Sequence, residues 1–343
     1  MLELRDVSRR VSGVNHLSGI SLRLERGALN VLLGPTRAGK TSLIRVMAGL
    51  DRPSAGSVLF DGQDVTDRPV SKRNVAMVYQ QFVNYPGWTV RENIASPLKV
   101  RGTAPAEIER EVKRVADLLR LRDYLDRRPM ELSGGQQQRV AIARALVKKA
   151  GLVLLDEPLA NLDYKLREDL RVELPRLFAD SAAVVVYATT EPSEALLLDG
   201  VTVAMHEGRA VQSGPTQSVY REPQDLTTAR IFSDPPINTL PVEAAINPAR
   251  FAGATTLALR AHHVRLQPRS AASDVYIAEV ESIEINGSES FVRLNVRGQH
   301  WVMLARGIHT FAPGTSLTVY VEPDDMMQFD AAGRAIPSKR EAA

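Results

Sequence analysis

Cysteine is absent from this 343-residue sequence, and histidine is scarce, with six residues. The lack of cysteine excludes disulfides, thiolate catalysis and cysteine-based zinc sites. His206 and the adjacent His262 and His263 have no carboxylate at the spacing of a metal site. These histidines therefore favour packing or surface roles over metal binding.

Long hydrophobic runs are also missing. No apolar stretch reaches the roughly 18 residues that a membrane-spanning helix needs. The first six residues mix charged and apolar side chains, so they lack the apolar core of a signal peptide. We therefore expect a cytoplasmic protein that reaches a membrane only through a partner.

Basic clusters and aromatic side chains are few. Aromatic residues make up 5% of the chain, and the net charge of +3 is small and dispersed. A nucleic-acid-binding protein instead gathers lysine and arginine on one face, so we expect no nucleic-acid partner. The hydrophobic share of 44% and the charged share of 24% are ordinary for a soluble globular protein. The length allows two domains or three.

A glycine-rich loop stands between a predicted buried strand and a predicted helix near the N-terminus. The sequence from Gly34 to Thr41 fits the phosphate-binding pattern G-x-x-x-x-G-K-[ST] in the strand–loop–helix context that the pattern requires. Its glycines let the backbone approach a ligand, and its N–H groups and the positive helix end face an anion. Lys40 can reach the β- and γ-phosphates, and the Thr41 hydroxyl can bind Mg²⁺. The loop therefore predicts nucleotide binding over a chance glycine-rich turn.

Strand-like and helix-like segments alternate around this loop. Residues 2–34 alternate apolar and polar side chains in places, as half-buried antiparallel strands do. Helices are predicted at 42–48, 89–128 and 136–149, and strands at 29–33, 57–60, 75–79, 152–155 and 183–187. Wholly apolar short runs are typical of central parallel strands. The pattern predicts an α/β fold with a parallel core sheet.

The composition changes near residue 236, where prolines punctuate the chain. Short β-like segments follow, separated by turns such as Asn286-Gly287 and Pro313-Gly314. Several short strands at near-regular spacing predict a small all-β barrel. We therefore expect a nucleotide-binding domain at 1–235 and an all-β domain at 236–343.

Four further motifs accompany the phosphate loop. Residues 132–136 read Leu-Ser-Gly-Gly-Gln and open a predicted helix, and Asp156-Glu157 ends an apolar strand. The segment from Leu159 to Asp163 follows, and Gln80 comes just after another strand. Together these motifs resemble those of the ATP-binding subunits of ABC transporters, over essentially the whole chain.

Finer details resemble the carbohydrate-importer branch of that family. They are the segment at 156–163, Asp-Glu-Pro-Leu-Ala-Asn-Leu-Asp, the run from Val219 to Pro223 and the segment from Phe329 to Ile336. Members of that branch carry an OB-type barrel at the C-terminus, which agrees with the β-rich segment. The resemblance implies a P-loop NTPase core, with antiparallel β and helical subdomains, and a regulatory OB-fold-like domain.

The resemblance implies ATP and Mg²⁺ as cofactors and assigns a role to each motif. Asp156 is expected to hold Mg²⁺ together with Thr41 and Gln80. Glu157 is expected to orient and deprotonate the attacking water, with Lys40, Gln80 and Thr190 as the other catalytic positions. The nucleotide-binding residues are expected to be Gly34, Pro35, Thr36, Arg37, Ala38, Gly39, Lys40, Thr41, Ser42, Ser133, Gly134, Gly135, Gln136 and Asp163.

The resemblance also implies partners. In this family the signature around Ser133 faces the phosphate loop of a second subunit, and this chain has one copy of each motif, so a second ATPase chain is implied. Transmembrane permease subunits would receive the motion near Gln80, through Tyr85-Pro86 and the segment 90–93. An extracytoplasmic solute-binding protein would act indirectly. The expected location is the cytoplasmic face of the inner membrane, as a peripheral protein.

Two positions depart from the family pattern. Thr190 stands where members usually have a histidine, and a short neutral hydroxyl reaches less far than an imidazole. The stretch 8–16 contains no Phe, Tyr or Trp to stack on adenine, and Val11 or Val14 takes that place. Arg37 is a lesser departure, because a small residue is commoner there.

These departures suggest the hypothesis that the chain's own site binds ATP weakly and hydrolyses it slowly. Its signature would then serve a better site on a different ATPase chain, although a homodimer that tolerates Thr190 is an alternative. The predicted function is the energy-coupling ATPase of an importer for a sugar, glycerol or glycerol phosphate. The alternative is an ATP-binding regulatory subunit with little turnover.

Overall fold

The computed structural model describes residues 1–337 except 82, 161, 163, 180 and 181. The chain forms two compact units, Met1–Gln217 and Ser218–Ala343. This division precedes the boundary at 235/236 predicted from composition. Helix α8 (Leu226–Ile231) explains the difference, because its Ala229 packs in a buried cluster with Ala258 and Phe329 of the second unit.

A six-stranded sheet forms the centre of the first unit. Its order is β10 (Arg209–Pro215), β9 (Val201–His206), β3 (Leu29–Leu33), β8 (Val184–Thr189), β7 (Leu152–Asp156) and β6 (Val75–Val78). All neighbours pair in parallel except β9 and β10. Every residue of β7 and β8 is buried, so the parallel core predicted from apolar runs is confirmed.

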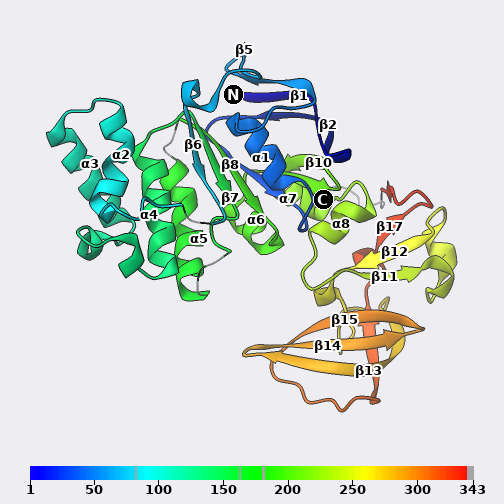
Figure 1. Ribbon diagram of the computed structural model, residues 1–343. Coiled ribbons are helices and arrows are strands. Elements are labelled where there is room, and N and C mark those ends of the chain that lie inside the picture. The colour runs from blue at the N-terminus through cyan, green and yellow to red at the C-terminus, as the bar shows by residue number, and fades with distance from the viewer. Residues whose placement is uncertain (82, 161, 163, 180–181, 338–343) are drawn as a thin grey trace. The chain divides into compact units, whose positions relative to one another are not determined.

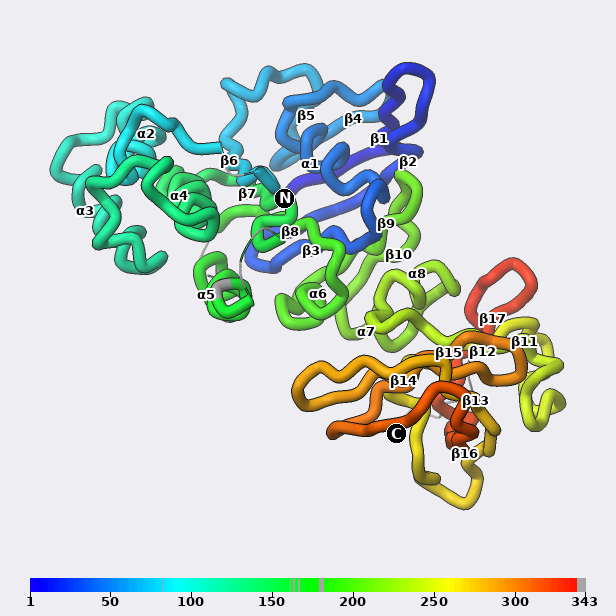
Figure 2. The backbone as a smooth tube through the Cα atoms, turned by 60° about the horizontal axis from the view of Figure 1, so that its bottom comes forward, coloured from blue at the N-terminus to red at the C-terminus, as the bar shows by residue number. Residues whose placement is uncertain are grey.

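Helices cover both faces of this sheet. Figure 2 shows α1 (Lys40–Ala48) on one face and α5 (Tyr164–Ala179) and α6 (Pro192–Leu198) on the other. Helix α1 begins directly after the glycine-rich loop, so the sheet and the helix together fix both ends of that loop.

A second sheet of the first unit is antiparallel, with the order β2 (Val14–Leu24), β1 (Leu2–Val11), β4 (Ala55–Phe60) and β5 (Gln63–Asp64). One buried cluster joins side chains of this sheet, such as Leu4, with Leu43 of α1 and Val184 of β8. The antiparallel strands predicted from alternation are thus confirmed.

Three further helices lie together in Figure 1: α2 (Val90–Val100), α3 (Pro105–Leu118) and α4 (Gly134–Val147). The sequence predicted one helical stretch over 89–128, whereas the chain turns between α2 and α3, where Gly102 has a φ of +71°. Thr89 begins α2 with a capping box, since its side chain accepts from the Glu92 N–H. Among the described residues, no helix is long and apolar enough to cross a membrane.

The second unit is mainly antiparallel β structure. One sheet has the order β11 (Asn238–Pro241), β12 (Thr256–Leu259), β17 (Met327–Phe329) and β18 (Ala335–Ile336). The other has the order β15 (Gln299–Arg306), β14 (Glu289–Val296), β13 (Asp274–Asn286) and β16 (Ser316–Val321). Tyr276 and Trp301 pack in its core with ring centroids 5.4 Å apart. The predicted all-β C-terminal region is confirmed.

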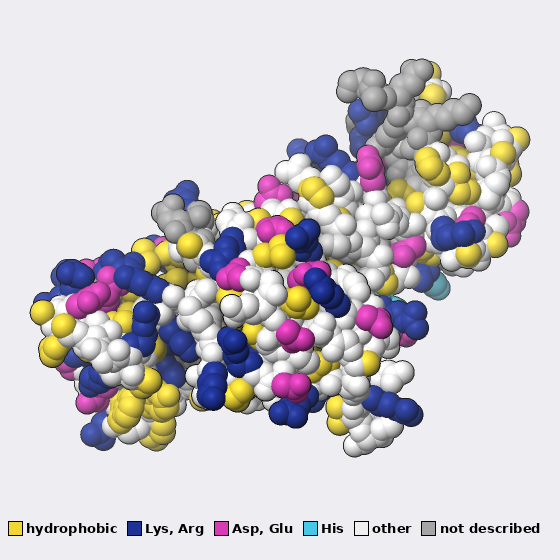
Figure 3. Space-filling model, turned by 90° about the horizontal axis from the view of Figure 1, so that it is seen from above, with side chains coloured by type: hydrophobic (Ala, Val, Ile, Leu, Met, Phe, Trp, Pro, Cys, Tyr) yellow, Lys and Arg dark blue, Asp and Glu magenta, His cyan; other side chains and the backbone are white. Residues whose placement is uncertain are grey.

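Charged side chains are interleaved on the surface. Figure 3 shows lysine and arginine alternating with aspartate and glutamate on the face that it presents.

Helix α7 (Thr216–Arg221) completes the main elements. The short 3₁₀ helices are Val70–Lys72, Arg122–Tyr124, Pro129–Glu131, Val242–Ala244, Pro248–Phe251, Ala261–His263 and Pro323–Asp325.

Candidate nucleotide site

The glycine-rich loop has no room for side chains at its two glycines. A Cβ at Gly34 would lie 2.3 Å from the Met205 carbonyl oxygen. Gly39 has a φ of +101°, and a Cβ there would lie 3.0 Å from the His16 carbonyl oxygen. The loop therefore needs glycine at both positions, and its backbone rather than side chains forms the cradle that an anion would meet.

Lys40, the first residue of α1, turns back over this loop. Its Nζ donates to the carbonyl oxygens of Gly34 at 2.8 Å and Pro35 at 3.1 Å. The same Nζ lies 3.2 Å from Glu157 Oε1, and the lysine side chain is only 4% exposed. Burial lowers the pKa of Lys40, and the Glu157 carboxylate partly offsets this effect. The cation thus lies beside the loop, where a phosphate would need it.

Asp156 ends β7 and faces the start of α1. Its Oδ1 accepts a hydrogen bond of 3.2 Å from the Thr41 hydroxyl. Burial raises the pKa of Asp156, the Thr41 hydrogen bond opposes that shift, and the neighbouring Glu157 charge reinforces it. Two hard oxygen donors at the end of a parallel strand fit Mg²⁺ in chemistry.

Glu157 connects three parts of the site. It has a φ of +45°, which is unusual for a residue other than glycine. Its carboxylate contacts Lys40 on one side, and its Oε2 accepts from Gln80 Nε2 at 3.1 Å on the other. The structure therefore brings together five candidate site residues from separate segments: Lys40, Thr41, Gln80, Asp156 and Glu157.

The end of β8 holds the backbone of this constellation. The Ala188 carbonyl accepts from the Glu157 N–H at 3.0 Å, and the next carbonyl, of Thr189, accepts from the Gly34 N–H at 3.4 Å. Consecutive residues of one strand thus fix the first residue of the loop and the residue after β7.

The Leu-Ser-Gly-Gly-Gln segment begins α4. Ser133 is the N-cap, and its Oγ accepts from the Gln136 N–H at 3.3 Å. The Gln136 side chain accepts in return from the Ser133 N–H at 2.9 Å, which completes a capping box. Ser133 is exposed, Gly134 and Gln136 are half-buried and Gly135 is buried. The serine thus stands at the surface at a helix N-terminus.

Comparison with known proteins decides the family. The ABC transporter family model matches residues 17–160, and the TOBE domain model matches residues 257–329. A curated relative from Rhizobium etli, named sn-glycerol-3-phosphate import ATP-binding protein UgpC 3, is 38% identical over 96% of this chain and 97% of its own. The chain belongs to the ABC transporter ATP-binding proteins.

A second curated relative and a solved structure are also similar to this chain. The sn-glycerol-3-phosphate import ATP-binding protein UgpC of Paracoccus denitrificans is 35% identical over 97% of this chain and 98% of its own. Among solved structures, the dimeric post-hydrolysis state of the ATP-binding cassette MJ0796, bound to ADP and Pi, is 26% identical with a TM-score of 0.58. It covers 63% of this chain and 99% of its own. This chain is therefore an ABC ATPase of the ATP-binding importer type.

Thr190 follows β8, which pairs with the strand that ends at Asp156, and its side chain is exposed. Its neighbour Thr189 is buried, and the Thr189 hydroxyl donates to Glu194 at 2.6 Å and accepts from the Glu191 N–H at 3.0 Å. The ABC ATPase thus holds the residue before Thr190 tightly and leaves Thr190 itself facing outward.

The expected adenine position is apolar and exposed. Val11 is 37% exposed and Val14 is 62% exposed, at the turn between β1 and β2. The following residues of β2 approach the loop, as the closeness of His16 to Gly39 shows.

Asp163, the last predicted nucleotide contact, lies outside the described residues. Pro35, Thr36 and Arg37 are exposed, Ala38 is buried and Ser42 is half-buried.

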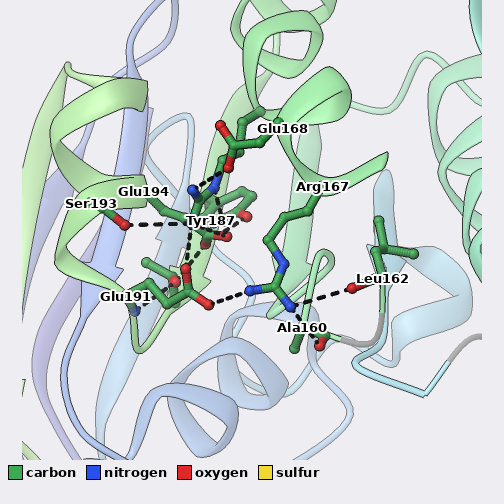
Figure 4. Close-up of polar contacts among 10 residues, drawn as sticks. Ala160, Leu162, Arg167, Glu168, Tyr187, Glu191, Ser193 and Glu194 are labelled. Atoms are coloured by element: carbon green, nitrogen blue, oxygen red, sulfur yellow. Dashed lines mark hydrogen bonds and ion pairs between the residues drawn. The ribbon is translucent and has the colours of Figure 1, made fainter. Parts of the chain in front are cut away.

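A cluster of charged side chains beside this site was not predicted. It contains Arg167, Glu168 and Arg171 of α5 with Glu191 and Glu194 at the start of α6 (Figure 4). Its residues come from two segments separated in the sequence, so no local pattern predicts the contacts between them. Within α5 the sequence does offer a signal, because Glu168 and Arg171 carry opposite charges one helical turn apart.

Proposed function

We propose that this chain couples ATP hydrolysis to import of a carbohydrate or polyol, with sn-glycerol 3-phosphate as the first solute to test. The observation that carries the proposal is the convergence of Lys40, Thr41, Asp156, Glu157 and Gln80 around one glycine-rich loop. The solute follows from the names of relatives that match nearly the full chain. A spermidine/putrescine importer subunit of Nitrosomonas europaea is 42% identical, but over 65% of this chain.

In this proposal each residue of the site has one role. The loop N–H groups and Lys40 bind the triphosphate and balance its charge. Glu157 orients a water and accepts its proton, and Gln80 holds the Glu157 carboxylate in place. Thr41 and Asp156 would hold Mg²⁺, which supplies charge neutralisation on the phosphate oxygens.

The same proposal includes partners. A groove of about 810 Å³ lies between β6, α2 and α4, close in sequence to Gln80, and Tyr85 and Trp88 line it. Tyr85 is 43% and Trp88 is 45% exposed, as the docking segment of a permease loop would require. The partners are transmembrane permease subunits, a second ATPase chain and, indirectly, an extracytoplasmic solute-binding protein. The chain would then lie at the cytoplasmic face of the inner membrane.

We also propose that the chain's own site turns over slowly. Thr190 lacks an imidazole, and exposed valines replace a stacking ring, which elsewhere is worth about 1–3 kcal/mol. The intact signature at Ser133 would serve the site of a second ATPase chain, so the pair would be a heterodimer. Residues 1–235 would carry nucleotide binding and residues 236–343 would carry regulation. The second candidate, a regulatory subunit with little turnover, is favoured by the same two departures.

Three measurements test these proposals: ATP binding, solute uptake and ATP hydrolysis. In the assembled transporter, Lys40→Ala should bind ATP less tightly, and uptake of labelled glycerol 3-phosphate should require this chain. The isolated chain should hydrolyse ATP slowly, and Glu157→Gln should abolish that turnover, with Glu107→Gln on α3 as the control. Robust turnover by the isolated chain that Glu157→Gln abolishes would refute the weak site and favour a homodimer. Uptake that is independent of the chain would refute the importer function.

A further inference from the structure

The charged cluster beside the nucleotide site has a buried carboxylate at its centre. Glu194 accepts hydrogen bonds from the Tyr187 hydroxyl at 2.9 Å and from the Thr189 hydroxyl at 2.6 Å. Arg171 Nε lies 3.4 Å from the same carboxylate. Burial and the Glu194 charge raise the pKa of Tyr187, so its hydroxyl stays a donor. Glu194 thus fixes Thr189, whose carbonyl holds the Gly34 N–H.

A second part of the cluster reaches the segment after Glu157. Arg167 Nη1 donates to Glu191 Oε1 at 2.9 Å. Its Nη2 donates to the carbonyl oxygens of Ala160 at 3.3 Å and Leu162 at 3.4 Å. Figure 4 shows the guanidinium between Glu191 and these two carbonyls. One planar group therefore joins the chain after Glu157 to the residue directly after Thr190.

Arginine is suited to this task. Its guanidinium is planar and its donors are fixed in a fork, so it bonds several acceptors only when they stand at defined positions. Glu191 is held in turn, because Arg171 Nη2 also donates to it and Arg171 is only 12% exposed. Arg167 would therefore lose hydrogen bonds if Ala160 and Leu162 moved away from Glu191.

We propose that Arg167 and Glu191 are positioning residues for ATP hydrolysis, which hold Ala160 and Leu162 against the segment that carries Thr190. The proposal deepens the proposed function and rests on it. Among the described residues, neither side chain of the pair touches the loop that would bind phosphate. The pair acts through the backbone that follows Glu157 and through Glu191, which directly follows Thr190.

Amide hydrogen exchange tests the pair without requiring turnover. In the wild-type chain the N–H groups of Ala160, Leu162 and Glu191 are hydrogen-bonded. Arg167→Gln should raise their exchange rates about tenfold, because local opening becomes easier. Arg120→Gln is the control, since Arg120 also pairs with α5, at Asp169 and Glu173, but contacts neither segment. Exchange that is equal in the two variants would overturn the proposal.

Kinetics of the isolated chain give the second readout, because its own site is then the one that turns over. Arg167→Gln and Glu191→Gln should each lower kcat about tenfold to a hundredfold, with KM for ATP changed less than about twofold. The double variant should be no slower than the worse single variant, because the two residues act as one unit. Arg167→Lys keeps the charge but not the fork, so it should recover part of kcat. The urea midpoint should not move, because both partners are partly exposed.

The outcomes separate the two proposals. A fall in stability with kcat unchanged would assign the cluster a structural role and overturn positioning. If the wild-type complex hydrolyses no ATP, the proposed function fails, and the exchange comparison still decides whether the pair positions the two segments.

Discussion

At the scale of single residues, the buried carboxyl group of Asp156 opposes folding. Its side chain is 3% exposed, and burial raises its pKa above the ordinary value of 3.8. The folded chain therefore holds this proton to higher pH than the unfolded chain does. The free energy of unfolding falls as the pH rises from about the unfolded pKa through the raised folded pKa.

Asp156→Asn should therefore stabilise the chain at pH 7 by on the order of 1 kcal/mol, while it weakens Mg²⁺-dependent ATP binding. The amide oxygen can still accept the Thr41 hydrogen bond, while the change removes the charge and replaces the other oxygen with an NH₂ group. The gain should vanish as the pH is lowered toward 3.8, the ordinary value. Urea unfolding at several pH values measures it, with Asp123→Asn at an exposed position as control. A variant that is less stable than the wild type at pH 7 would contradict the argument.

Thr190→His should raise the ATPase rate of the isolated chain. An imidazole at the end of β8 reaches farther than a hydroxyl and can hydrogen-bond a terminal phosphate. We expect a gain of roughly tenfold to a hundredfold in kcat, within the range of a single catalytic hydrogen bond. Leu197→His, at an exposed position on α6, is the control. Equal rates in the wild type and Thr190→His would show that the weak site has another cause.

At the scale of elements, the sequence predicted a strand or helix correctly where one continuous stretch of residues carried the pattern. The apolar run at 152–155 predicted β7, and the carboxylates directly after it had to lie at the end of that strand. The helix predicted at 136–149 is α4, shifted by two residues, because the capping box of Ser133 and Gln136 starts it earlier.

Contacts between distant elements could not be predicted. Arg167 and Glu191 are separated by 24 positions, and each looks like an ordinary solvated charge in the sequence. The break between α2 and α3 was also missed, since Val100 and Arg101 continue the helical pattern until Gly102 takes a left-handed conformation. The first case depends on tertiary packing, whereas the second has a local cause, because Gly102 stands just past the end of α2 and Pro105 begins α3.

The junction between β3 and α1 gives a prediction at this scale. Gly34→Ala should destabilise the chain by about 1–3 kcal/mol and impair ATP binding, because the Cβ would meet the backbone of β9 at Met205. Gly87→Ala is the matched control, since a Cβ there meets nothing within 4 Å. This second change should be neutral or should stabilise by up to about 1 kcal/mol. Urea unfolding and ATP titration measure both, and equal stability of the two variants would contradict the packing argument.

At the scale of the whole molecule, the residues proposed to bind nucleotide separate into two groups. The first group is joined by side-chain contacts and by neighbouring positions in the chain. It contains Lys40, Thr41, Asp156, Glu157 and Gln80. Ser133 is bonded to Gln136 of its own helix and is exposed. If the chain's own site is weak and its signature serves a partner, the two groups should contribute unequally to transport.

The assembled transporter tests this inequality. Ser133→Arg should abolish uptake, because an arginine at the N-terminus of α4 would occupy the space of the partner's nucleotide, while ATP affinity of the isolated chain stays unchanged. Lys40→Ala should weaken ATP binding by the isolated chain yet slow uptake only about tenfold or less, since the partner's site still turns over. Ala106→Arg, at an exposed position in the first turn of α3, controls for the added charge. Lys40→Ala that abolishes uptake as completely as Ser133→Arg would instead mean that both sites must hydrolyse ATP.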